Sequence, residues 1–302
     1  MTQTPFRWDL VSPDQLGSLL SGTAEPSLWF LDSLAECAGK VLARSGNGDL
    51  FFIGRSLDSM FDLLSGVFAG AASAPQLGRL PLSFQRPWGP SGSGWRRRPL
   101  TSAEIARARH LLAAAGLAPQ ALARRSRPAV FTDVVYEGGT FTELFTLLQD
   151  WISEEHAQWD VIRLKLRFTG VTIRRKTSPN TVRWQQQEPW TRLLPARAVQ
   201  NVSLDWPVWT YLADRQVKLT RSYFPDRWLA EADGPDHRDA TRQALAEAVA
   251  LVACGRTGAT RRHIARTIGA EPALAEPWLR SLVTTLSQPR LIKDLPEASL
   301  LR

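Results

Sequence analysis

Residues 128–142 read PAVFTDVVYEGGTFT, and this stretch decides the fold class. An apolar run of strand length leads to Asp133, a Gly-Gly-Thr turn follows at residues 138–140, and an apolar pattern with helical spacing begins at once. The residues that recur on one face of this helix are Phe141, Leu144, Phe145, Leu148, Trp151 and Ile152. Strand, glycine turn and helix in this order predict an α/β fold with a parallel sheet.

The glycine turn has the character of an anion site. It places backbone N–H groups and the positive end of a helix at the carboxyl edge of the sheet, where a negative ligand is stabilised without a cationic side chain. A plain α/β crossover with a glycine turn and no ligand fits the same residues.

Length and composition bound the class of protein. The chain has 302 residues and 44% hydrophobic content, enough for one large core or two smaller ones. No apolar run is long enough to span a bilayer, and the start MTQTPFRWDL lacks the features of a signal peptide, so we expect a cytoplasmic protein without membrane contact. Cys37 and Cys254 lie far apart and the four histidines show no ligand spacing, so we expect no metal site built wholly from protein.

Charge and aromatic content point to the kind of partner. A net charge of +8 favours a polyanionic or phosphorylated partner, although arginines scattered over helices also suit a solvated surface. Of the twelve tryptophans, five fall within residues 184–228. Some of these are candidates to face a planar ligand, and core packing accounts for most.

A second strand, turn and helix lies earlier in the chain. After an expected helix at residues 28–44 comes a short buried strand at residues 50–53, followed by the polar turn Gly54, Arg55 and Ser56 and a further helix. This turn is a second candidate anion loop, and a surface connection with a solvated arginine is the alternative.

A basic loop lies between the two turns. Residues 82–100 are rich in glycine, proline and serine, which predicts mobility, and they carry Arg86, Arg96, Arg97 and Arg98. Several cations near two anion loops suit a lid that closes on phosphates. Thr101 and Glu104 then predict a capping box for a helix that ends near residue 115.

The C-terminal half is less regular. We expect a strand at residues 161–168, possible pairing or extension by residues 171–173, and an aromatic cover with short strands at residues 199–204 and 217–223. Residues 235–302 are predicted to be helical, with helix-turn-helix spacing around Ile264 and Gly269. Pro272 and Pro277 interrupt the would-be recognition segment, so two packed helices are the simpler interpretation.

Taken together, these features resemble the type I phosphoribosyltransferase family over about residues 50–228. The resemblance rests chiefly on TDVVYEGGT and on the order of its parts: a turn after the first strand, a basic flexible loop, and a glycine turn that opens a helix. It implies a phosphoribosyltransferase-like parallel-sheet core with an irregular hood at residues 1–234, and a helical segment at residues 235–302.

The resemblance also implies roles for single residues. Gly54, Arg55 and Ser56 would hold pyrophosphate, Asp133 would orient ribose, and the 5-phosphate of phosphoribosyl pyrophosphate would bind Gly138, Gly139 and Thr140. Residues 199–223 would form the hood over the acceptor base. For base contact the residues are Tyr136, Trp206 and Trp209. Mg²⁺ would enter with the substrate.

Two residues depart from the family pattern. Thr132 stands where a second acid is usual, and Glu137 stands where a threonine or serine is usual. A carboxylate about 4 Å from a phosphate costs on the order of 1 kcal/mol in water and several times more in a sheltered site. Either Glu137 points away, or the ligand has no phosphate there and Glu137 accepts from a sugar hydroxyl or contacts Mg²⁺.

The function that we expect is therefore a Mg²⁺-dependent phosphoribosyltransferase acting on phosphoribosyl pyrophosphate or a related nucleotide or ribose ligand. The alternatives are a nucleotide-sensing regulator that binds DNA through its C-terminal helices, and a partner-binding protein with a vestigial pocket. A homodimer is possible.

Overall fold

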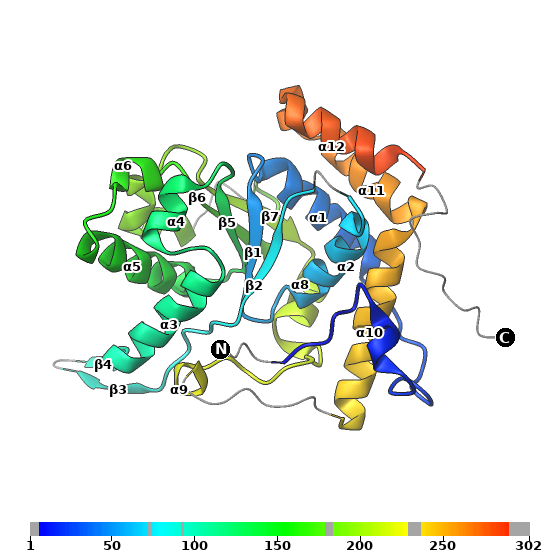
Figure 1. Ribbon diagram of the computed structural model, residues 1–302, viewed down its shortest axis with the longest axis horizontal. Helices are drawn as coiled ribbons and strands as arrows, with labels where there is room; N and C mark the ends of the chain where they lie inside the picture. The colour runs from blue at the N-terminus through cyan, green and yellow to red at the C-terminus, as the bar shows by residue number, and fades with distance from the viewer. Residues whose placement is uncertain (1–5, 72–73, 92–93, 179–183, 229–236, 290–302) are drawn as a thin grey trace.

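The protein is built around a five-stranded parallel sheet (Figure 1). The computed structural model describes residues 6–71, 74–91, 94–178, 184–228 and 237–289. The strands are β1 (Asp49–Ile53), β2 (Leu77–Leu80), β5 (Ala129–Val134), β6 (Leu166–Ile173) and β7 (Val199–Leu204), in the order β2-β1-β5-β6-β7. All pairings are parallel, which confirms the predicted α/β class with a parallel sheet.

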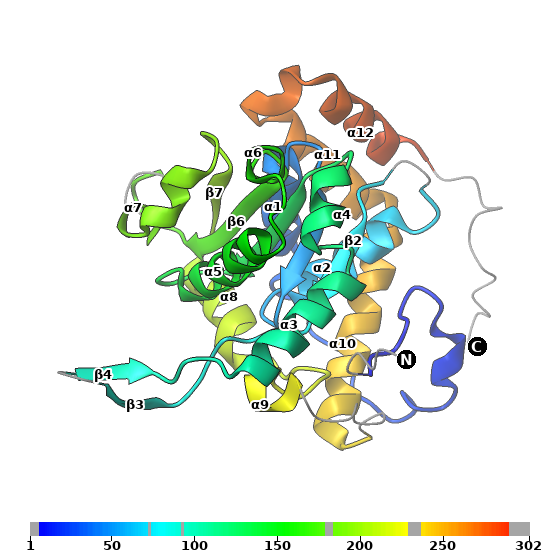
Figure 2. The same ribbon diagram turned by 60° about the vertical axis from the view of Figure 1, so that its left-hand side comes forward.

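Helices cover both faces of the sheet (Figures 1 and 2). Strands buried on both faces read as continuous apolar runs, as in the fully buried β1 sequence DLFFI. One face is covered by α1 (Leu31–Arg44) and α2 (Asp58–Phe68). Three C-terminal helices, α10 (Asp239–Arg256), α11 (Gly258–Gly269) and α12 (Pro277–Ser287), pack on the outer side of this layer. The other face packs on α3 (Ser102–Ala114), α4 (Pro119–Arg124) and α5 (Gly139–Glu154).

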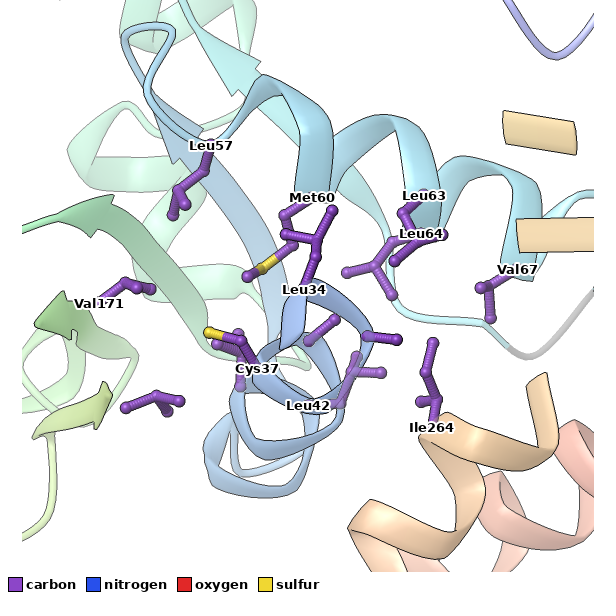
Figure 3. Packing of buried hydrophobic residues seen from close by; sticks show 14 of the residues in the cluster. Leu34, Cys37, Leu42, Leu57, Met60, Leu63, Leu64, Val67, Val171 and Ile264 are labelled. Atoms are coloured by element: carbon purple, nitrogen blue, oxygen red, sulfur yellow. The ribbon is translucent and has the colours of Figure 1, made fainter. Parts of the chain in front are cut away.

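The C-terminal helices share the core of α1 and α2. Figure 3 shows Ile264 of α11 in the same cluster as Leu34, Leu42 and Met60. Helix α10 contacts α2 backbone to backbone, because a Cβ atom on Gly66 would stand 2.0 Å from the carbonyl oxygen of Val252. Glycine at that position therefore allows the close approach of the two helices.

The remaining elements are short. The antiparallel hairpin of β3 (Trp88–Ser91) and β4 (Gly94–Arg97) projects away from the body of the protein (Figure 2). The others are the α-helices α6 (Trp159–Ile162), α7 (Trp184–Gln187), α8 (Trp206–Thr210) and α9 (Pro225–Trp228), the 3₁₀ helices η1 (Pro13–Leu16), η2 (Pro189–Leu193) and η4 (Pro272–Ala275), and the π-helix η3 (Tyr211–Arg215). Among the described residues, no helix has the length and apolarity needed to cross a bilayer.

Several boundaries differ from the prediction. The strand expected at residues 161–168 is wrong: Trp159–Ile162 form α6, with Val161 exposed and Ile162 buried, and the strand begins only at Leu166. Of the two alternatives for residues 171–173, extension is confirmed, because they belong to the same strand, β6. The capping box at Thr101 is confirmed, with Glu104 N–H donating to the Thr101 hydroxyl at 3.2 Å.

The prediction that residues 199–204 and 217–223 belong to a cover over the sheet edge also needs correction. Val199–Leu204 form β7, the edge strand of the core sheet itself. Its residues Asn201, Val202 and Leu204 are buried, as expected for a strand covered on both faces. Residues 217–223 are not a strand, and lie along the carboxyl edge of the sheet as an irregular strap.

Candidate functional site

The two glycine turns open into one cleft at the carboxyl edge of the sheet. Strands β1 and β5 are neighbours and run parallel, so the turns that follow them lie at the same edge. The cleft has a volume of about 640 Å³, within the usual range for sites that bind nucleotide-sized ligands. The predicted residues that line it are Gly54, Arg55, Ser56, Arg97, Asp133, Tyr136, Glu137, Gly138, Gly139, Thr140 and Trp209.

The turn after β5 is fixed by a tryptophan. Gly138 is the N-cap of α5 and has a left-handed backbone with φ 84°. A Cβ atom at this position would stand 2.2 Å from Cε3 of Trp184, so only glycine fits beside the indole ring. The indole N–H of Trp184 donates to Oδ1 of Asn201 at 2.8 Å, between two buried side chains. Trp184 was not predicted as a site residue.

Asp133 is buried at the end of β5, with its side chain facing the cleft. Val134 N–H donates to its Oδ1 at 2.7 Å. Burial raises the pKa of Asp133 to about 8, while the hydrogen bonds from Val134 and the Thr140 hydroxyl and the charge of Lys218 act in the opposite direction. At neutral pH the carboxyl group therefore carries its proton and can donate a hydrogen bond to a sugar oxygen.

Thr132 lies on the opposite face of β5 from Asp133, because successive strand residues alternate. Its side chain is fully buried, and its hydroxyl has no hydrogen-bond partner among the described residues. Thr132 therefore does not supply the cleft with a second polar group in place of the missing acid.

Tyr136 and Glu137 stand at the rim of the cleft. The Tyr136 side chain is 71% exposed, and Glu137 is also exposed. Solvent screens the charge of an exposed carboxylate, so Glu137 repels an anion at the turn less than a buried acid would.

Arg55 holds the strap at residues 217–223. Its Nη1 donates to the carbonyl oxygen of Thr220, and its Nη2 donates to the Ser222 hydroxyl at 2.7 Å. The guanidinium group predicted to bind pyrophosphate is thus engaged with the protein, and it forms a wall of the cleft.

Lys218 was missed by the sequence reasoning, and it lines the cleft from the strap. Its Nζ donates to the carbonyl oxygen of Leu212 at 2.9 Å, to Oε1 of Gln216 at 2.6 Å and to the carbonyl oxygen of Ser56 at 3.5 Å. Burial lowers the pKa of Lys218 to about 8. The available signal was a lysine between two apolar residues in the segment QVKLT, which is typical of a half-buried cation.

The four predicted lid arginines do not share one role. Arg86 donates to Glu143 of α5 at 2.7 Å, and Arg98 donates to Glu104 at 2.6 Å, so both secure the base of the hairpin. Nη1 of Arg97 lies 3.6 Å from the position of a Cβ atom on Gly139, beside the glycine turn. The side chain of Arg96 lies outside the described part of the structure.

Of the two predicted stacking tryptophans, only one lines the cleft. Trp209 lines the cleft as part of its wall and donates its indole N–H to the carbonyl oxygen of Val171 at 2.9 Å. Trp206 is 56% exposed and is not among the cleft residues; Arg215 lies over its ring at 5.9 Å.

The acids of the cleft do not form a metal site. Within the described residues, no group of three histidine, cysteine, aspartate or glutamate side chains is placed to hold a metal ion. Asp133, the buried acid of the cleft, retains its proton and is therefore a poor ligand for Mg²⁺, which binds through ionised carboxylates, waters and phosphates. The donor set therefore does not fit a resident Mg²⁺ ion.

Comparison of the chain with models of protein families, with curated proteins and with solved structures gave no match in any of the three.

Proposed function

We propose that the cleft is a phosphoribosyltransferase-like site that binds a ribosyl phosphate. The observation that carries this proposal is the meeting of two glycine turns from adjacent parallel strands around the buried carboxyl group of Asp133. Ligands of open α/β sheets bind in the crevice outside the carboxyl ends of the strands, which supports this placement.

In the proposed complex, the turn at residues 138–140 binds the phosphate and Asp133 contacts the ribose. The phosphate accepts from backbone N–H groups at the start of α5, where the helix dipole favours negative charge. Protonated Asp133 donates to a ribose oxygen. Tyr136 and Phe224 at the rim offer apolar surface to a base.

Phosphoribosyl transfer requires few side chains to take part in the reaction itself. A ribosyl group that develops positive charge at its anomeric carbon is stabilised by positioning and by exclusion of water. Arg97, beside Gly139, is the cation placed to accompany the phosphate. Any Mg²⁺ in such a reaction would come with the ligand, because the described acids of the cleft are not grouped to hold a metal ion.

The experiment is isothermal titration of ribose 5-phosphate and phosphoribosyl pyrophosphate into wild-type protein and Asp133→Ala. The proposal expects saturable binding of at least one ligand to wild type. It also expects Asp133→Ala to weaken it, because a methyl group can neither donate to a ribose oxygen nor make the Thr140 contact. Asp150→Ala, on the exposed side of α5, is the matched control. Absence of binding by both ligands contradicts the proposal.

The C-terminal helices do not favour the DNA-binding alternative. Seven residues, 270–276, separate α11 from α12, whereas a helix-turn-helix uses a turn of three or four. Arg280 of α12 donates to the carbonyl oxygen of Leu274 at 3.3 Å, so its side chain contacts the connection between α11 and α12.

A further inference from the structure

We infer that the cleft takes a ribosyl ligand with one phosphate group, such as ribose 5-phosphate or a nucleoside 5′-monophosphate, and that the turn at Gly54 is not a second phosphate site. This inference rests on the proposed function. It narrows the ligand class, because a donor that carries pyrophosphate needs two anion sites. The two turns of the cleft differ, and only the turn after β5 suits an anion.

The turn after β5 is open to an anion. Helix α5 begins at Gly139 with no acid in its first turn, and its N-cap Gly138 has no side chain to cap the first N–H groups. Anions bind such helix starts through the free N–H groups. The nearby guanidinium group of Arg97 adds positive charge on the same side.

The turn after β1 leads instead to an acid. Helix α2 begins with Asp58, whose side chain is buried, and Asp62 lies buried one turn later. Arg7 from the N-terminal segment contacts both acids, with Nη1 3.3 Å from Asp58 and Nη2 2.6 Å from Asp62, and Nη1 of Arg79 lies 3.9 Å from Asp58. The start of α2 therefore already has an acid supplied by the protein, although Asp58 lies behind the turn and is not among the residues that line the cleft.

The two cations beside the turn after β1, Arg55 and Lys218, donate their hydrogen bonds to oxygen atoms of the protein. Arg55 uses Nη1 and Nη2 on Thr220 and Ser222. The three donors of the Lys218 ammonium group point to Leu212, Gln216 and Ser56. A diphosphate at this turn would have to displace these hydrogen bonds and release the strap, whereas a monophosphate at Gly139 leaves them intact.

The charge of the whole cleft agrees with a small anion. Its lining holds the cations Arg55, Arg97 and Lys218 and the acids Glu137 and Asp214, besides Asp133, which retains its proton. Such a balance does not attract a highly charged ligand strongly, because the field of a site follows the sum of its charges. The cations of the cleft can balance one phosphate at the start of α5, but they cannot also balance a diphosphate.

The test is isothermal titration of wild-type protein with ribose 5-phosphate, adenosine 5′-monophosphate, phosphoribosyl pyrophosphate and inorganic pyrophosphate, each with and without Mg²⁺. We expect the two monophosphates to bind. Phosphoribosyl pyrophosphate should bind no more than about threefold more tightly than ribose 5-phosphate, and pyrophosphate at a tenfold higher concentration should not compete. Arg97→Gln should weaken the binding of ribose 5-phosphate about tenfold, and Arg163→Gln, at an arginine that does not line the cleft, should change it less than threefold.

The outcomes separate the inference from the function on which it rests. Competition by pyrophosphate, or a gain of tenfold or more from the pyrophosphate group, would overturn the inference and leave a phosphoribosyltransferase-like site in place. Failure of every ribosyl phosphate to bind would overturn both. The wild-type titrations decide between these results even if Arg97→Gln does not fold.

Discussion

The indole ring of Trp184 lies directly against the α-carbon of Gly138, where a Cβ atom would stand 2.2 Å from Cε3 of the ring. Trp184 belongs to α7 and is held by Asn201 of β7, whose amide in turn donates to Oε1 of Gln185 at 2.9 Å. The glycine turn after β5 is thus fixed from the far edge of the sheet. A turn held in one conformation presents its N–H groups to a ligand without a cost of ordering.

Gly138→Ala is expected to disrupt the turn more than backbone strain alone would. Gly70 provides the control, because it has φ 75° and no described atom lies within 4 Å of its Cβ position. Gly70→Ala should cost about 1–2 kcal/mol of unfolding free energy, the usual cost of a left-handed alanine. Gly138→Ala should cost at least about 2 kcal/mol more in urea denaturation, because Trp184 must also move. Equal losses for the two variants would mean that Trp184 does not constrain the turn.

Trp184→Phe is expected to destabilise the protein by about 1–3 kcal/mol, because it leaves the buried Oδ1 of Asn201 without its donor. Trp206→Phe serves as the control: Trp206 is exposed, and its replacement should change the unfolding free energy by less than about 0.5 kcal/mol. Circular dichroism in the far ultraviolet measures both, since each variant loses an indole fluorophore. A loss for Trp184→Phe as small as that of the control would contradict the account.

Asp133 should make the protein less stable as pH rises. Its folded pKa of about 8 lies above the ordinary value of 3.8, so the folded state holds a proton that the unfolded state releases between these two values. The stability that depends on this proton is present below pH 4 and is lost by pH 8. Each tenfold change in proton affinity corresponds to about 1.4 kcal/mol.

Asp133→Asn removes this dependence. The variant should gain about 1–3 kcal/mol of unfolding free energy relative to wild type at pH 8, and much less at pH 4. Denaturant titrations at both pH values give the comparison, with Asp150→Asn as the exposed control. A gain that is the same at both pH values would show that Asp133 is ionised in the folded protein.

Arg55 should protect the strap from proteolysis. Loss of its hydrogen bonds to Thr220 and Ser222 is expected to raise the population of the opened strap, so trypsin should cleave at Lys218 and Arg221 about 5- to 30-fold faster in Arg55→Gln. Arg97→Gln, which alters the hairpin side of the cleft, should leave these sites as slow as in wild type. Equal cleavage in all three proteins would show that Arg55 does not hold the strap.

The parallel sheet and the first two turns were predictable from sequence because their signals are local. The strand and helix around Asp133 and Gly138 follow from periodicity and glycine chemistry alone. The role of β7 was missed, since an aromatic and irregular setting hides a buried edge strand. The partners of Arg55, Arg86 and Arg98 lie outside any local pattern: Arg55 binds residues 165 and 167 positions away, and only the fold brings them together.

Amide chemical shifts of the two turns test the central claim most directly. In a ¹⁵N–¹H correlation spectrum, titration with ribose 5-phosphate should shift the amides of Gly139 and Thr140 strongly and saturably, as expected for N–H groups that donate to a phosphate. The amides of Arg55 and Ser56 should move little. Saturable shifts confined to Arg55 and Ser56, or no shift at either turn, would contradict the assignment of the Gly138 turn as the phosphate site.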